Sequence, residues 1–136
     1  MADITVTAAN VLKGSNAQTF EGVAGATITA GDVCYKDTAD SNKYKLAINS
    51  AEASSAGVAI ALCGAATGQP VVLQRSGDIN PGGTVVVAEV YCVSPVAGGI
   101  APDADVASGD FRTVLGVGIT ATNIAMDIQV SGVAVP

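Results

Sequence analysis

The chain has 136 residues, among them 24 Ala, 19 Val and 16 Gly, but only two Phe, three Tyr and no Trp. Hydrophobic residues make up 49% and charged residues 13%, a balance that excludes an intrinsically disordered chain. The net charge of −6, with only six basic residues, argues against nucleic acid and anionic membrane surfaces as partners. His, the commonest general base and metal ligand, is absent, so we expect no enzymatic activity and no cofactor.

Gly and Pro interrupt the sequence so often that long helices have little room, whereas alternation of period two is common. The alternating runs that predict strands are, in chain order, residues 4–8, 44–48, 58–63, 111–119 and 124–130. Residues 53–74 are uncharged, but their turn at 67–70 favours two strands over a membrane span. Only residues 49–56 are compatible with a helical turn or a loop. We therefore predict an all-β fold, a small β-sandwich or barrel.

Three short matches in the same order indicate an internal repeat and hence two related strand sets. They relate residues 33–35 to 90–92, 57–60 to 116–119 and 75–77 to 130–132, at offsets of 57, 59 and 55. A composition dominated by Ala, Val and Gly also produces such matches by chance, so both interpretations stay open. For the domain organisation we predict an N-terminal arm, residues 1–19, followed by a single β domain, residues 20–136.

Two predicted strands, residues 57–63 and 84–88, carry no charge on either face. In a small sandwich one face of each sheet should be polar, so a second apolar face needs a cover. We expect a partner subunit to supply it, because the shortage of large side chains also weakens an isolated core. This predicts self-association in a closed symmetric oligomer.

The three cysteines, Cys34, Cys63 and Cys92, are an odd number without a CxxC motif. We expect them to be small buried hydrophobic residues of a protein made in a reducing compartment. The alternatives are an intermolecular disulfide or a reactive thiol.

Two stretches imitate ligand-binding motifs. Residues 115–121 satisfy the loose GxGxxA pattern of dinucleotide sites, but a strand follows them instead of the required helix. Asp103, Asp105 and Asp110 lie in one loop and have the oxygen ligands that calcium prefers, but their spacing fits an ordinary polar loop better. Asp37 and Asp40 form a second polar turn. We therefore expect no metal site.

Several further segments have a recognisable pattern of turns and strands. They are residues 28–33 (ITAGDV), 56–59 (AGVA), 98–102 (GGIAP), 108–111 (SGDF), 114–118 (VLGVG) and 131–134 (SGVA). In these segments the chain resembles the small decoration (cement) proteins of tailed-phage capsids, over roughly residues 20–136. Related strings occur in phage head-fibre proteins, so a receptor- or glycan-binding adhesin module remains the alternative.

The resemblance implies a viral structural protein without enzymatic activity. Its partners would be the major capsid protein of a bacteriophage and further copies of the same chain, most simply in a homotrimer. Such a protein is made in the host cytoplasm, binds the outer capsid surface of the virion and stabilises the mature shell. The aromatic residues are few and scattered, which favours this function over that of an adhesin.

The start of the chain is the candidate capsid contact, because it alternates apolar and polar residues: Ala2, Asp3, Ile4, Thr5, Val6, Thr7 and Ala8. An extended segment of this kind can add to the edge of a capsid subunit's sheet through main-chain hydrogen bonds. The alternative is that it pairs within its own sheet or trimer.

Overall fold

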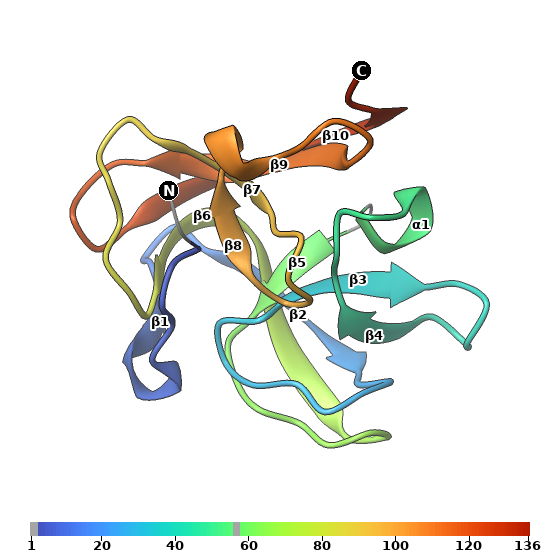
Figure 1. Ribbon diagram of the computed structural model, residues 1–136. Helices are drawn as coiled ribbons and strands as arrows, with labels where there is room; N and C mark the ends of the chain where they lie inside the picture. The colour runs from blue at the N-terminus through green and yellow to red at the C-terminus, as the bar shows by residue number, and fades with distance from the viewer. Residues whose placement is uncertain (1–2, 56–57) are drawn as a thin grey trace.

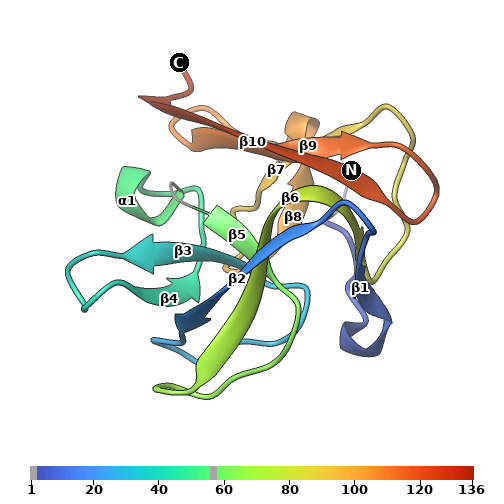
Figure 2. The same ribbon diagram turned by 180° about the vertical axis from the view of Figure 1, so that it is seen from behind.

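The computed structural model describes residues 3–55 and 58–136 and places ten strands in one antiparallel sheet (Figures 1 and 2). The spatial order is β4-β3-β5-β6-β10-β9-β7-β8, and β1 and β2 also pair with β6. In chain order the strands are β1 (Val11–Lys13), β2 (Gln18–Val23), β3 (Val33–Asp37), β4 (Lys43–Leu46), β5 (Val58–Ala61), β6 (Pro70–Pro81), β7 (Val90–Val93), β8 (Ile100–Pro102), β9 (Phe111–Gly118) and β10 (Ile124–Ala134). Short helical turns are η1 (Ala8–Asn10), α1 (Glu52–Ser55) and η2 (Asp103–Asp105). The all-β prediction is confirmed, and the sheet curls into a half-barrel.

Strand β6, with 12 residues, runs through both halves of the molecule. Its beginning pairs with β2 and β5, and its end pairs with β1 and β10. Between the two parts the strand bends at Gly77, whose φ of +87° suits glycine. The buried side-chain amide of Gln74 donates across this bend to the carbonyls of Ser76, at 3.1 Å, and Asp78, at 2.8 Å. We call β2 to β5 with the beginning of β6 the first half, and the end of β6 with β7 to β10 the second half.

The first half closes on itself as a small barrel. Ala24, just after β2, forms a parallel bridge with Tyr44 of β4, and the N–H of Gly25 donates to the carbonyl of Tyr44 at 2.7 Å. Because the diameter of a barrel grows with its number of strands, five strands leave a narrow interior. Mostly small buried side chains fill it: Ala24, Ile28, Cys34, Ala59, Ala61, Ala65, Val71 and Leu73. Half of these side chains are alanines, in keeping with the narrow interior.

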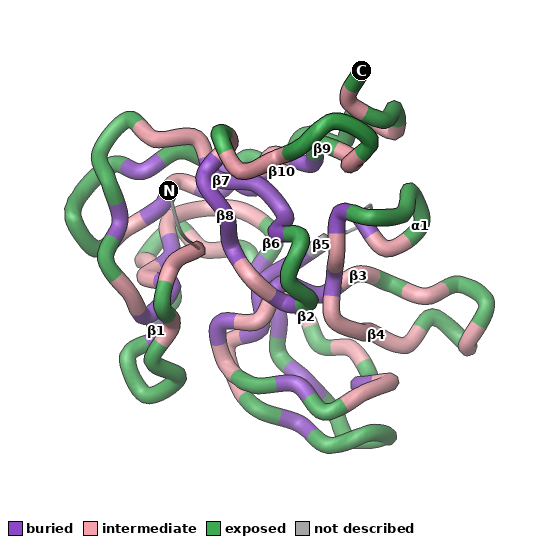
Figure 3. Tube along the Cα trace, viewed as in Figure 1, coloured by how far each residue is buried: buried purple, intermediate pink, exposed green. Residues whose placement is uncertain are grey.

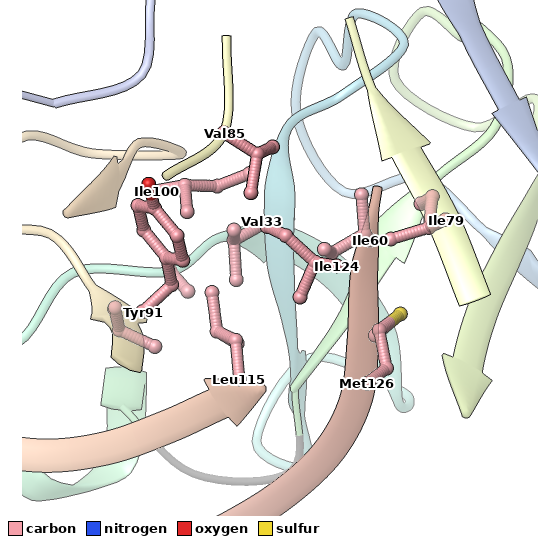
Figure 4. Packing of buried hydrophobic residues seen from close by; sticks show 11 residues of the cluster. Val33, Ile60, Ile79, Val85, Tyr91, Ile100, Leu115, Ile124 and Met126 are labelled. Carbon is pink, nitrogen blue, oxygen red and sulfur yellow. The ribbon is translucent and has the colours of Figure 1, made fainter. Parts of the chain in front are cut away.

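A second core lies between the two halves and contains larger side chains (Figure 4). Val33 and Ile60 reach it from the first half, and Tyr91 and Leu115 from the second half. The buried members of this main core are Val33, Ala47, Ile60, Ile79, Val85, Tyr91, Val93, Ile100, Leu115, Ile124 and Met126. In Figure 3 the buried backbone accordingly concentrates where β7 and β8 face the first half.

The predicted internal repeat is present as two strand sets of identical order. The order β4-β3-β5-β6 recurs as β8-β7-β9-β10. Val33 pairs with Ile60 as Val90 pairs with Val117, which relates the two sets by an offset of 57 residues. Main-chain hydrogen bonds repeat at the same offset: Gly31 donates to Ala61 and Ala88 donates to Gly118, each at 2.8 Å.

Two of the three matches in the sequence were aligned wrongly. The offset for β5 and β9 is 57 and not 59, and Gly57 lies outside the described residues. Residues 75–77 and 130–132 are not equivalent, because Gln74 and Ala125 occupy corresponding registers and differ by only 51. The turn between β9 and β10 is shorter than the one between β5 and β6, which explains the change of offset.

Residues 84–88 do not form the predicted strand. The N–H of Val85 donates to Ala121 and that of Val86 to the hydroxyl of Tyr91, both at 2.9 Å, so these groups make no ladder with a neighbouring strand. Residues 4–7 are likewise no strand, and residues 49–56 contain the single turn α1, with Ala56 outside the described residues.

Strand β5 is covered on both faces by the chain itself, not by a partner subunit. Ala59 and Ala61 face the barrel interior, and Ile60 faces the main core. The apolar character of this strand therefore gives no support to self-association. Any support must come from side chains that are exposed.

Candidate interaction surface

The predicted capsid-contact residues lie against their own domain. Ala2 is outside the described residues, residues 3–7 run from the start of β8 to the chain just after β6, and Ala8 begins the exposed turn η1. The N–H of Ile4 donates to the carbonyl of Ile100 in β8 at 2.9 Å, and the N–H of Thr7 donates to the carbonyl of Gly82 at 2.8 Å. We call residues 3–7 the docked segment.

Glycines line the trough that holds the docked segment. A Cβ atom at Gly83 would lie 2.4 Å from the carbonyl oxygen of Thr5, and one at Gly82 would lie 2.5 Å from that of Thr7. Both distances are shorter than any real contact of a side-chain carbon, so only glycine allows the two backbones to approach this closely. The floor of the trough is completed by Gly31 and Gly99, which lie against the side chains of Val6 and Asp3.

Two side chains anchor the docked segment. The hydroxyl of Ser94 donates to the carboxylate of Asp3 and accepts the N–H of Val96 at 2.9 Å. The side chain of Ile4 packs against the main core. Beyond these anchors Thr5, Thr7 and residues 8–10 are exposed, so the segment is fixed at its beginning and accessible from Thr5 onward.

Beside the docked segment the surface has a hollow of about 410 Å³. The hollow is lined by Asp3, Ile4, Thr5, Thr7, Gly82, Gly83, Thr84, Val86 and Tyr91. Its lining offers hydroxyls and main-chain groups but a single carboxylate, which is already hydrogen-bonded. Such a lining contains no nucleophile and base pair. Its lining is therefore suited to holding a peptide segment through main-chain hydrogen bonds.

Most of the exposed large aliphatic side chains gather at three places, apart from Val23 and Val96. Val86, Val87, Val117 and Ile119 lie where the loop before β7 meets the end of β9, with Val87 60% exposed. Val130 and Val133, the latter 69% exposed, lie in the outer part of β10. Leu12, 63% exposed, borders a groove of about 350 Å³ that Val11, Lys13, Thr19, Leu62, Cys63 and Val72 also line. Exposed apolar groups of this kind are typical of surfaces that bind other proteins.

The β3–β4 hairpin carries three of the four lysines, and two of them pair with acids of the same hairpin. Lys45 lies 2.8 Å from Asp37 and 3.1 Å from Asp40, and Lys43 lies 4.0 Å from Asp40. The hydrogen bond from Lys45 lowers the pKa of Asp37, and the two carboxylates raise the pKa of Lys45. The polar turn predicted at Asp37 and Asp40 is thus a locally neutralised surface.

The acidic loop is also structural. Asp103 pairs with Arg112 at 3.0 Å, and Asp110 accepts the N–H of Ala107 at 3.1 Å. Over residues 3–55 and 58–136, no group of three His, Cys, Asp or Glu side chains is placed to hold a metal ion. The pattern at residues 115–121 forms the end of β9 and a turn into β10, without the helix that a dinucleotide site requires.

All three cysteines are free thiols. Cys34 and Cys92 are buried as predicted, and burial raises the pKa of each to about 12, so both remain protonated and inert at neutral pH. Cys63 is only half-buried, contrary to the prediction, because its sulfur lies at the groove beside Leu12, where it accepts the N–H of Val72.

The sequence analysis identified residues 2–8 as a candidate capsid contact, with pairing inside the same sheet or trimer as the alternative, but missed the trough that holds residues 3–7. The sequence signal that could have revealed the trough was its two glycine doublets, Gly82-Gly83 and Gly98-Gly99, because each doublet contributes a residue to the floor.

Within the described part of the chain, no helix is long and apolar enough to span a membrane. Comparison of the sequence with protein-family models and with curated proteins finds no match.

Proposed function

We propose that this protein is a decoration protein of a tailed-phage capsid. In this proposal it binds the major capsid protein on the outer surface of the virion as a homotrimer and stabilises the mature shell, without enzymatic activity. The resemblance of residues 20–136 to such proteins is the starting point. The exposed aliphatic side chains are the observation that carries the proposal, since they give this acidic protein apolar surface for contact with other subunits.

The segments that carry the resemblance also carry some of these side chains. Val117 lies in the VLGVG segment of β9, and Val133 lies in the SGVA segment of β10. Both are exposed and belong to the second half. A surface that binds only the mature shell stabilises that shell by mass action, and many copies multiply a modest contact.

While the segment 3–7 is docked, only part of the predicted capsid contact is free to meet a shell. Thr5, Thr7 and Ala8 are exposed, whereas Ile4 is held by the main core and β8. We therefore assign the exposed residues of this stretch, not Ile4, to the proposed shell contact. Deleting residues 1–8 should weaken binding to shells; a still-folded oligomer that binds undiminished would remove this stretch from the contact.

The decisive experiment is co-sedimentation of the purified protein with mature phage shells assembled without it. We expect saturable binding at a fixed number of copies per shell and a higher temperature of shell disruption. The substitution Val133→Asp should weaken binding at least about tenfold, or about 1.4 kcal/mol, because it places a charge in an apolar contact.

The matched control is Val23→Asp, an exposed valine of a first-half strand outside the segments that carry the resemblance. It should bind shells like the unaltered protein. Absence of saturable binding, or electron density of the virion that places this chain at fibre tips, would contradict the proposal. The second of these results would favour the adhesin.

A further inference from the structure

The two halves of the molecule close their free edges differently. In the first half, the outer edge of β4 is closed by the N–H of Gly25, which donates to the carbonyl of Tyr44 at 2.7 Å. By the register of the repeat, β2 corresponds to the end of β6, so that Gly25 corresponds to Thr84, and Tyr44 corresponds to Ile100 in β8. A direct copy of the first half would therefore join the chain just after β6, at Thr84, to Ile100.

The second half has an additional segment inserted at this position. The carbonyl of Ile100 accepts the N–H of Ile4, and the carbonyl of Gly82 accepts the N–H of Thr7. The docked segment thus lies between β8 and the chain just after β6, and the corresponding segments of the first half bond to each other directly. The trough is the open seam of the second half, and an extended peptide closes it.

The seam selects its occupant by main-chain approach and by two anchors. Its glycine floor admits a backbone at distances that any Cβ would forbid, Ser94 binds a carboxylate, and the main core receives one aliphatic side chain. The occupant must therefore be an extended segment that begins with an acidic residue followed by an aliphatic one. Residues 3 and 4 of this chain have that chemistry, and every other copy of the chain carries the same segment.

We propose that in the assembled protein this seam is filled by residues 3–7 of a neighbouring copy, so that the subunits are linked by exchanged segments. The connection between the docked segment and β1 is the turn η1, whose residues 8–10 are all exposed and bury no side chain. Redirecting this turn exchanges one copy's segment for another's without losing a contact in the seam. A head-to-tail exchange of this kind gives a closed ring, such as the proposed trimer, when the rotation between neighbouring copies closes. The inference rests on the self-association in the proposed function, but not on binding to a capsid.

A disulfide between copies tests the exchange, because the side chains of residues 3 and 94 touch. One full-length chain carries Asp3→Cys and a second carries Ser94→Cys, both in a Cys63→Ser background that removes the partly exposed thiol. The two chains are co-expressed, purified as an assembly and oxidised. We expect a covalent pair of the two chains on a non-reducing denaturing gel, because neither chain alone contains both thiols.

Each chain expressed alone is the control for side reactions with Cys92 and should stay monomeric on the same gel. A third chain with both substitutions reports whether the geometry allows the bond at all. An assembly in which this double variant forms only bonds within a chain, with no covalent pair from the mixture, overturns the inference. A protein that stays monomeric at all concentrations in sedimentation also overturns it. A covalent pair in a protein that fails to bind shells would support the exchange and contradict the capsid function.

Discussion

The first half and the second half of this molecule have the same strand order but different interiors. At corresponding positions the first half has Cys34, inside its narrow barrel, and the second half has Tyr91, in the main core. The first half closes its edge with its own backbone, whereas the second half needs residues 3–7. The same strand order is thus compatible with two arrangements. The first half has a small interior and an edge closed by its own backbone, whereas the second half contributes larger side chains to the main core and has an edge that accepts another segment.

The largest effect should come from emptying the larger core. Tyr91→Ala removes a buried aromatic side chain from between the halves, so we expect a loss of about 3–5 kcal/mol in the free energy of unfolding. Urea denaturation followed by circular dichroism measures this loss. Tyr91→Phe is the control: it removes only the hydrogen bond from Val86 and should cost about 0.5–1.5 kcal/mol. Equal losses in the two variants would mean that the ring itself does not fill this core.

Enlarging a side chain in the narrow barrel should have the next largest effect. Ala61→Leu adds volume to an interior that has little room, so we expect a loss of about 1–3 kcal/mol through overpacking. The matched variant Ala66→Leu, in the exposed turn after β5, should change the free energy of unfolding by less than about 0.5 kcal/mol. If Ala61→Leu proved neutral in urea denaturation, the barrel interior would be wider than its small side chains imply.

The smallest effect on global stability is expected from closing the seam against its occupant. Gly83→Ala places a Cβ where the backbone of Thr5 lies, so it should expel the docked segment while both cores stay intact. Amide hydrogen exchange should show faster exchange at Ile4 and Thr7 and unchanged protection in β6. Gly64→Ala, whose Cβ would meet only an ordinary contact at 3.4 Å, is the control and should leave both residues protected.

The strands were largely predictable because their side chains alternate, as in residues 111–119 and 124–130, which form β9 and β10. The contacts that close the edges of the two halves were not predictable, because Gly25 bonds to Tyr44 and Ile4 bonds to Ile100, and these residues lie far apart in the sequence. Alternation also cannot say what covers an apolar face. At β5 the cover is the same chain, which the composition alone could not distinguish from a partner.

The candidate surface was predictable only in part. The segment beginning at Asp3 was identified by its pattern, but its docking depends on the floor of the trough, where four glycines separated in sequence come together. The loop 84–88 was mistaken for a strand because its residues favour β structure, yet Ala88 adopts a φ of +68°, which ends extended pairing. Such backbone demands leave no mark in a pattern of apolar and polar residues.

Strand β6 has a consequence for how the protein comes apart. Since its beginning is a wall of the barrel and its end pairs with β10, neither half can lose its structure without stripping hydrogen-bond partners from the other. We therefore expect the two strand sets to unfold together as one cooperative unit and not as two independent domains. In the proposed role on a phage shell, this arrangement would distribute a mechanical load on one strand set over the other.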